Sequence, residues 1–206
     1  MTLQQQHYVM NTLRTTCAGL VRPSALLLID DYGKDPYLIL VGCILSLRTR
    51  DVVSYKASKL LFSHAQTPQQ MVRLSIALIE NSIHSVGFFR RKAQQIQTLN
   101  QQLIDQWGGN VPASMEELLT LAGVGRKTAN LVRGYGFDIP SICVDVHVHR
   151  LANQWGWVHT KTPEQTEYAL MRLFDKKYWI ELNQLLVMCG QNKKPLIFDN
   201  KWFFIS

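Results

Sequence analysis

Long hydrophobic runs are missing from this sequence of 206 residues. Its longest apolar stretch, from Tyr37 to Leu47, is shorter than the roughly 20 residues that a helix needs to cross a bilayer. We therefore expect this stretch to form a buried core helix. The first residues, MTLQQQHYVMNTLR, also lack the charged-then-apolar order of a signal peptide. The sequence predicts a cytoplasmic protein with no membrane partner.

Cysteine is scarce, and its spacing excludes the common cysteine frameworks. The four cysteines are Cys17, Cys43, Cys143 and Cys189. They are too scattered for a disulfide framework or a close metal knuckle, and without an export signal we expect reduced thiols. Cys143, His147 and His149 could supply three zinc ligands, but a helix would place the two histidines on different faces. We therefore predict no metal site.

Acidic residues are outnumbered, with 15 Asp and Glu against 22 Lys and Arg, which gives a formal net charge of +7. A surplus of this sign fits a polyanionic partner, because phosphate contacts release counterions from nucleic acid. Many basic proteins bind no nucleic acid, so the charge alone does not identify the partner.

Signals for β-strands are also absent, since the chain has no sustained apolar alternation and no Asn-Gly or Asp-Gly pair. Helix starts are frequent instead, at Asp35-Pro36, Thr67-Pro68, Ser114 and Thr162-Pro163. Gly108-Gly109 and Gly190 predict helix ends. We predict an all-α fold of roughly ten short helices. Glycines and a proline from Gly134 to Pro140 predict one domain boundary, and Arg22-Pro23 a second.

The most informative segment is Leu121-Ala-Gly-Val-Gly-Arg-Lys-Thr-Ala-Asn130. Gly123 and Gly125 permit a sharp turn with positive φ, and the amides at the start of the next helix form an anion site. Arg126 adds charge beside it. A bare Gly-x-Gly is more often a simple turn, but apolar residues around this one can pack two helices together. They are Leu121, Val124 and Ala129. The pattern is typical of a helix-hairpin-helix, which binds the DNA backbone without sequence preference.

Lys127 follows the hairpin in the first turn of the predicted helix, and Asp145 stands 18 positions later. Most lysines are solvated on a helix surface, and Lys127 could be one of these instead of a functional lysine. The positive end of the helix dipole and the neighbouring Arg126 both favour an unprotonated amine, which is the nucleophilic form. Asp145 precedes a predicted helix over 146–155, so it is also a candidate N-cap. A capping carboxylate is held rigidly, and both roles can hold together.

Several segments in order resemble the endonuclease III family of helix-hairpin-helix (HhH-GPD) DNA glycosylases. The resemblance covers about residues 35–191 and is carried by Leu45-Ser-Leu-Arg-Thr-Arg-Asp51, Gly87-Phe-Phe-Arg-Arg-Lys-Ala93, the hairpin Gly123–Asn130, Val144-Asp-Val-His-Val-His-Arg150 and Trp155-Gly-Trp157 to Thr166. The resemblance implies two helical domains with a DNA-binding cleft between them. One is a six-helix barrel, expected over 23–136, and the other is formed by 1–22 and 137–206.

Roles for individual residues also follow from the resemblance. Lys127 would be the nucleophile and Asp145 its carboxylate partner, while Gly123, Val124, Gly125 and Arg126 would hold a phosphate. Arg48 and Phe88 would fill the gap left by a flipped nucleotide. The family often has glutamine at the position of Arg48, and Phe88 has the alternative of a core side chain. His147 would lie near the pocket, or would hydrogen-bond internally.

The C-terminal segment departs from the family. Many members carry a four-iron four-sulfur cluster on four cysteines after the position of Gln191, and this chain has no cysteine beyond Cys189. We predict no cluster. Lys193, Lys194 and Lys201 with Trp202 could replace its loop as phosphate contacts over an apolar plug. We expect the apolar residues Phe198, Trp202, Phe203 and Phe204 to pack on the terminal domain instead.

The resemblance implies a monomeric, nucleoid-associated DNA glycosylase that also acts as a lyase at abasic sites in double-stranded DNA. Its expected substrates are oxidised pyrimidines. The alternative is a non-catalytic DNA-binding protein that kept the hairpin but lost its activity together with the cluster.

Overall fold

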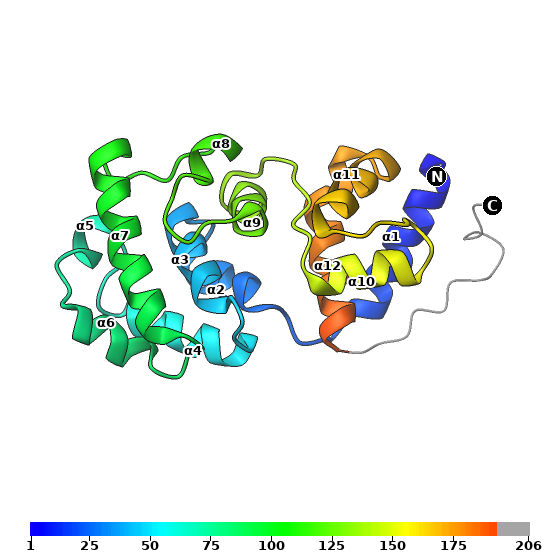
Figure 1. The fold of residues 1–206 in the computed structure, drawn as a ribbon. Coiled ribbons are helices and arrows are strands. Elements are labelled where there is room, and N and C mark those ends of the chain that lie inside the picture. The colour runs from blue at the N-terminus through cyan, green and yellow to red at the C-terminus, as the bar shows by residue number, and fades with distance from the viewer. Residues whose placement is uncertain (193–206) are drawn as a thin grey trace. The chain divides into compact units, whose positions relative to one another are not determined.

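The computed structural model describes residues 1–192, and all regular secondary structure within that range is helical (Figure 1). This confirms the predicted all-α class. The described residues form two compact units: Ser24–Ile139 form the central unit, and Met1–Pro23 with residues 140–192 form the terminal unit. Within residues 1–192, no helix is both long and apolar enough to cross a membrane.

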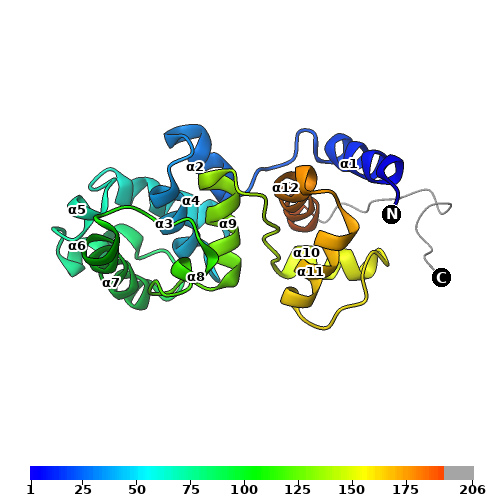
Figure 2. The same cartoon turned by 90° about the horizontal axis from the view of Figure 1, so that it is seen from above.

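The central unit contains eight α-helices: α2 (Ser24–Tyr32), α3 (Pro36–Ser46), α4 (Asp51–Phe62), α5 (Pro68–Met71), α6 (Ile76–Ile83), α7 (Phe89–Trp107), α8 (Met115–Leu118) and α9 (Arg126–Phe137). Helix α3 lies inside this unit and contacts α2, α4, α7 and α9 (Figure 2). Asp35 caps it by accepting bonds from the amides of Tyr37 and Leu38, and all of Tyr37–Leu45 is buried. An apolar residue on every face makes α3 the core helix of the unit.

Helix α9 ends within the segment Gly134–Pro140, where a boundary was expected. The helix continues through both glycines to Phe137 and ends at Asp138, which has a left-handed conformation with φ 53°. A Cβ at Gly136 would lie 2.9 Å from the Cα of Pro36, so glycine here lets α9 pack against the start of α3. Gly136 therefore serves helix packing, one residue before the helix ends. The units consequently meet at 139/140, three residues after the predicted boundary.

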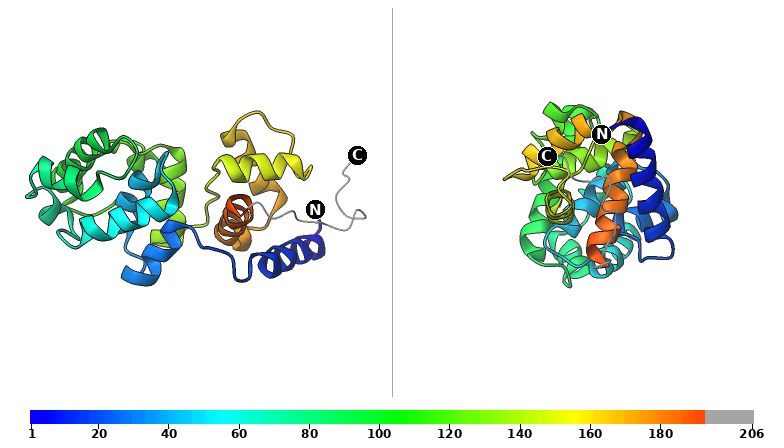
Figure 3. Two further views of the ribbon diagram at one scale, coloured as in Figure 1. Left: turned by 90° about the horizontal axis from the view of Figure 1, so that it is seen from below. Right: turned by 90° about the vertical axis from the view of Figure 1, so that its right-hand side faces the viewer.

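The terminal unit contains α1 (Leu3–Cys17), α10 (Val146–Gln154), α11 (Pro163–Leu173), the 3₁₀ helix η1 (Lys176–Tyr178) and α12 (Trp179–Gln191). Helix α1 runs beside α12 (Figure 3). Its buried residues Val9, Met10 and Leu13 share one apolar cluster with Leu182 and Leu186 of α12. The first and last helices described therefore form one core.

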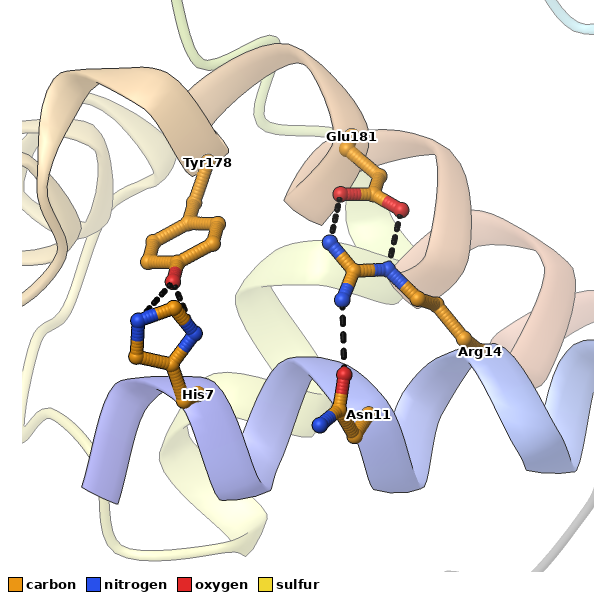
Figure 4. A network of polar contacts seen from close by, with 5 residues as sticks. All are labelled: His7, Asn11, Arg14, Tyr178 and Glu181. Carbon is orange, nitrogen blue, oxygen red and sulfur yellow. Dashed lines mark hydrogen bonds and ion pairs between the residues drawn. The ribbon is translucent and has the colours of Figure 1, made fainter. Parts of the chain in front are cut away.

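Polar contacts between α1 and the segment 178–181 reinforce that core (Figure 4). Arg14 donates two bonds of 2.7 Å to the carboxylate of Glu181 and a third to the side-chain oxygen of Asn11. The hydroxyl of Tyr178 lies 2.7 Å from Nδ1 of His7. These contacts join residues of η1 and α12 to a helix that precedes them by more than 160 positions.

Gly190 lies one residue before the end of α12, close to the predicted helix end. A Cβ at this position would be 2.5 Å from the Cβ of His147. Glycine at this position lets α12 pack closely against α10. The residues expected to replace the cluster loop, among them Lys193, Lys194, Lys201 and Trp202, lie outside the described residues, as do Phe198, Phe203 and Phe204.

Candidate active site

The hairpin lies between α8 and α9 and is packed against α7. Leu121, Val124 and Ala129 are buried, as the two-helix pattern predicts. Gln102 of α7 accepts a bond of 2.8 Å from the amide of Ala122. Gly123 has φ 79°, a left-handed conformation that favours glycine. Side chains of α7 thus fix the turn that leads into α9.

Gly125 corrects one detail of the prediction, because its φ is −104° and needs no glycine. Glycine matters here because the missing side chain leaves space, and not because the backbone conformation requires it. Of the atoms described, none lies within 4 Å of the Cβ that this glycine lacks. Gly125 is also the N-cap of α9 and supplies no side-chain acceptor to the helix start. The positive end of α9 is therefore open to an approaching anion.

Lys127 lies in the first turn of α9 and is partly buried, so it is not a fully solvated lysine. The next residue, Thr128, is buried, and its hydroxyl lies 3.6 Å from the sulfur of Cys43 on α3. Burial raises the pKa of the Cys43 thiol, and the charge of Lys127 acts in the opposite direction. The charge of Lys127 thus acts on a residue of the core helix α3.

Asp145 is the N-cap of α10, as predicted. Its Oδ1 accepts bonds of 2.9 Å from the amides of His147 and Val148. Both bonds use the same oxygen, which leaves Oδ2 available for a second function. Asp145 belongs to the terminal unit and Lys127 to the central unit.

Arg48 and Phe88, here called the wedge pair, are brought together by two loops of the central unit. The guanidinium of Arg48 lies over the ring of Phe88, 4.8 Å from its centroid. Both residues have left-handed backbones, with φ 54° and 59°. Phe88 is 58% exposed, so it is not a core side chain. An exposed aromatic in a strained conformation is a feature that clusters at functional sites.

A lysine that the sequence did not single out lies under the wedge pair. Lys92, in the first turns of α7, is only 4% exposed, and its ammonium contacts the loop that carries Arg48. Burial lowers the pKa of Lys92 to about 8. The run Arg90-Arg91-Lys92 gives no local sign of which cation is buried, because that depends on the loop after α3.

Comparisons with known proteins identify the family. The model of the HhH-GPD superfamily of base excision DNA repair proteins matches residues 41–176. Endonuclease III of Thermotoga maritima is 45% identical over 157 residues, which cover 76% of this chain and 74% of that protein. The chain belongs to the endonuclease III family. Endonuclease III of Bacillus subtilis is 34% identical over 158 residues, covering 76% of this chain and 72% of the relative.

Solved structures agree with this membership. A structure of a non-covalent endonuclease III–DNA complex superposes with a TM-score of 0.79 at 30% identity, covering 93% of this chain and 86% of the other. A trapped endonuclease III–DNA covalent intermediate gives a TM-score of 0.78 at the same identity, with 97% and 91% covered. This family member is accordingly a base excision repair DNA glycosylase.

His147 is packed rather than exposed in this endonuclease III-family protein. Its ring lies against Gly190 of α12, and its buried Nδ1 has no hydrogen-bond partner among the described residues. His147 does lie beside Asp145, because its amide donates to Oδ1 of Asp145, and its position near the pocket stays a prediction. His149 instead places its Nδ1 2.6 Å from the hydroxyl of Thr166.

The described residues do not fit the iron–sulfur cluster of many family members. Cys189 is buried on α12, with its sulfur 3.1 Å from the sulfur of Cys17 on α1. Over residues 1–192, no three His, Cys, Asp or Glu side chains come together as a metal site. Cys189 is thus part of a buried thiol pair within the helical core.

Proposed function

We propose that this DNA glycosylase is bifunctional, excising oxidised pyrimidines and then cleaving the strand 3′ to the abasic site through a lysine Schiff base. The position of Lys127 is the observation that carries the proposal. Lys127 lies in the first turn of α9, whose start has no side-chain cap, and its charge acts on Cys43 of the core helix α3. An amine held beside a phosphate site is placed to reach the adjoining sugar.

Binding to double-stranded DNA would begin at the hairpin. The backbone of Gly123, Val124 and Gly125 and the charge of Arg126 would hold a phosphate at the start of α9, where amides and helix dipole favour an anion. The two solved endonuclease III–DNA complexes that resemble this chain support DNA as the partner. We further propose that the protein acts as a monomer and without a cluster.

Base extrusion would expose the damaged nucleotide. The wedge pair would then occupy the gap, with the apolar ring of Phe88 unstacking the base step and the guanidinium of Arg48 stacked on it. The exposed position of Phe88 supports this role.

The chemistry would start when the Lys127 amine attacks the sugar C1′ with its lone pair. The bond from C1′ to the base breaks, and the base leaves with the bonding electrons and takes a proton from solvent. Asp145 would accept the proton that the amine loses and stabilise the cationic sugar. As the bond from C1′ to the ring oxygen O4′ breaks, Asp145 would return this proton to O4′, which gives a protonated imine between Lys127 and C1′.

Strand cleavage would follow by β-elimination. Loss of a proton from C2′ pushes electrons toward C3′, where the bond to the 3′ phosphate oxygen breaks. Water finally hydrolyses the imine, which frees Lys127 and leaves an unsaturated aldehyde on the DNA.

Borohydride trapping tests the proposal. Reduction of the imine should give a covalent protein–DNA adduct with an abasic-site duplex, and Lys127→Ala should abolish the adduct while the protein still binds the duplex. Lys56→Ala, which removes an exposed lysine of α4, is the matched control and should trap like the wild type.

Wild-type protein that binds the duplex without forming the adduct or nicking the strand would refute the lyase activity and favour the non-catalytic alternative. A panel of duplexes with oxidised pyrimidines tests the substrate class.

Asp145→Asn separates charge from capping, because asparagine is also a good N-cap. We expect the single-turnover rate of base excision to fall by about 10²- to 10⁴-fold, the usual range for a lost acid–base group. The melting temperature should stay close to that of the wild type. An unchanged excision rate would exclude Asp145 from the chemistry.

A further inference from the structure

The loop after α3 and the loop before α7 are fastened together directly beneath the wedge pair. The first loop contains Leu47, Arg48 and Thr49, and the second contains Gly87 and Phe88. The same set of hydrogen bonds therefore holds both residues of the wedge pair, and Lys92 makes most of these bonds.

The Lys92 ammonium uses each of its three N–H donors. It donates to the carbonyl of Leu45 at 2.9 Å, to the carbonyl of Leu47 at 2.5 Å and to the hydroxyl of Thr49 at 3.2 Å. Two acceptors are carbonyls at the C-terminal end of α3, where a cation is favourable. Its own amide donates to the carbonyl of Phe88 at 3.0 Å, so Lys92 holds both loops.

Thr49 completes the connection. Its hydroxyl accepts bonds from Lys92 and from the amide of Gly87 at 3.1 Å, and donates to the carbonyl of Leu47 at 3.4 Å. One hydroxyl has one donor and two acceptor positions, and all are used here. Arg48 and Phe88 each lie one position from a residue in this network.

Close contact between the loops explains Gly87. A Cβ at this position would lie 2.9 Å from the carbonyl oxygen of Arg48. The left-handed backbones of Arg48 and Phe88 are strained, and such conformations persist only where the surroundings over-determine them. The bonds from Lys92 and Thr49 supply that constraint.

We propose that Lys92 is a positioning residue that holds Arg48 and Phe88 ready for insertion into duplex DNA, an inference that rests on their proposed function as the wedge pair. Lys92 is buried and does not touch the DNA itself. It acts on the opening of the base stack and not on the chemistry at Lys127. A wedge that is already ordered does not lose conformational freedom when it enters the duplex.

Two substrates separate these effects. An abasic site in a duplex requires a wedge, whereas an abasic site in a single strand has no paired stack to open. Borohydride trapping through Lys127 reports on the chemistry in both. We expect Lys92→Met to slow trapping with the duplex by about tenfold or more, as the loss of buried hydrogen bonds would. The rate of trapping with the single strand should change by less than about twofold, because no base stack has to be opened and the lost hydrogen bonds therefore matter little. Lys56→Met makes the same substitution at an exposed site and should leave both rates unchanged.

Thr49 gives an independent test if Lys92→Met fails to fold. Thr49→Val keeps the shape but removes the hydroxyl, and should show the same selective loss with the duplex. Thr49→Ser keeps the hydroxyl and should restore the duplex rate. Fluorescence of 2-aminopurine placed opposite the abasic site should report slower unstacking in Thr49→Val alone.

Variants that are folded and trap the duplex at the wild-type rate would overturn the proposal. Equal losses with duplex and single strand would also overturn it, because they would indicate a general structural defect. Wild-type protein that traps neither substrate would instead refute the lyase function itself.

Discussion

In the central unit one helix, α3, is buried along nine consecutive residues, whereas the terminal unit joins segments 167–172 positions apart through side chains of α1. The central core depends on apolar burial. The terminal unit adds to its apolar cluster an ion pair, a histidine–tyrosine contact and a thiol pair. Both cores join segments far apart in the chain, but burial along one apolar helix dominates the first, whereas side-chain pairs made by α1 add to the second.

Leu40→Ala should have the largest effect on stability, because Leu40 is fully buried in α3. Truncation of a buried leucine leaves a cavity and costs about 2–5 kcal/mol. Urea unfolding followed by circular dichroism measures the change. Leu60→Ala, on the exposed face of α4, is the control and should stay within about 0.5 kcal/mol of the wild type. Equal effects of the two variants would contradict the central role of α3.

Glycine-to-alanine substitutions compare the two units directly. Gly190→Ala would place a methyl 2.5 Å from the Cβ of His147, and overpacking of this kind costs about 1–3 kcal/mol. Gly125→Ala meets open space and should leave the unfolding free energy nearly unchanged. The same methyl would lie at the proposed phosphate site, so the affinity for abasic-site duplex should fall. Thermal melts and fluorescence anisotropy measure the two quantities, and a stable Gly190→Ala protein would refute the tight packing of α10 on α12.

Arg14→Lys should have the smallest effect. The pair with Glu181 is bidentate but exposed, with 43% and 35% of the two side chains accessible. Exposed pairs contribute about 0.2–1 kcal/mol and are screened by salt. The variant keeps the charge but loses the two-pronged geometry, so its destabilisation should be detectable at low salt and vanish at high salt. A large, salt-independent loss would show that polar contacts, rather than the apolar cluster, hold α1 in place.

Local patterns account for what the sequence could predict. The apolar stretch after Asp35-Pro36 defines α3, and Asp145 caps α10 because its side chain reaches amides two and three positions away. Lys127 was identified because the hairpin beside it is a contiguous motif. These features depend on neighbours within a few residues.

Features that depend on packing were missed or misread. Gly136 and Gly190 do lie next to helix ends, at Phe137 and Gln191, but the sequence does not show that each also makes room for a neighbouring element. The position of the Lys92 ammonium depends on the carbonyls of Leu45 and Leu47, which precede Lys92 by 47 and 45 positions in the chain. Neither kind of contact leaves a local pattern.

The pairing of α1 with α12 also has a consequence for the order of synthesis. Arg14 leaves the ribosome 167 residues before Glu181. At about 5–20 residues per second, α1 waits on the order of ten seconds or longer for the helix that covers it. All of residues 24–139 emerge in that interval, so the core around α3 can assemble while the apolar face of α1 is still uncovered. A nascent chain of this protein therefore passes through a stage in which one half can be compact and the other still lacks its closing helix.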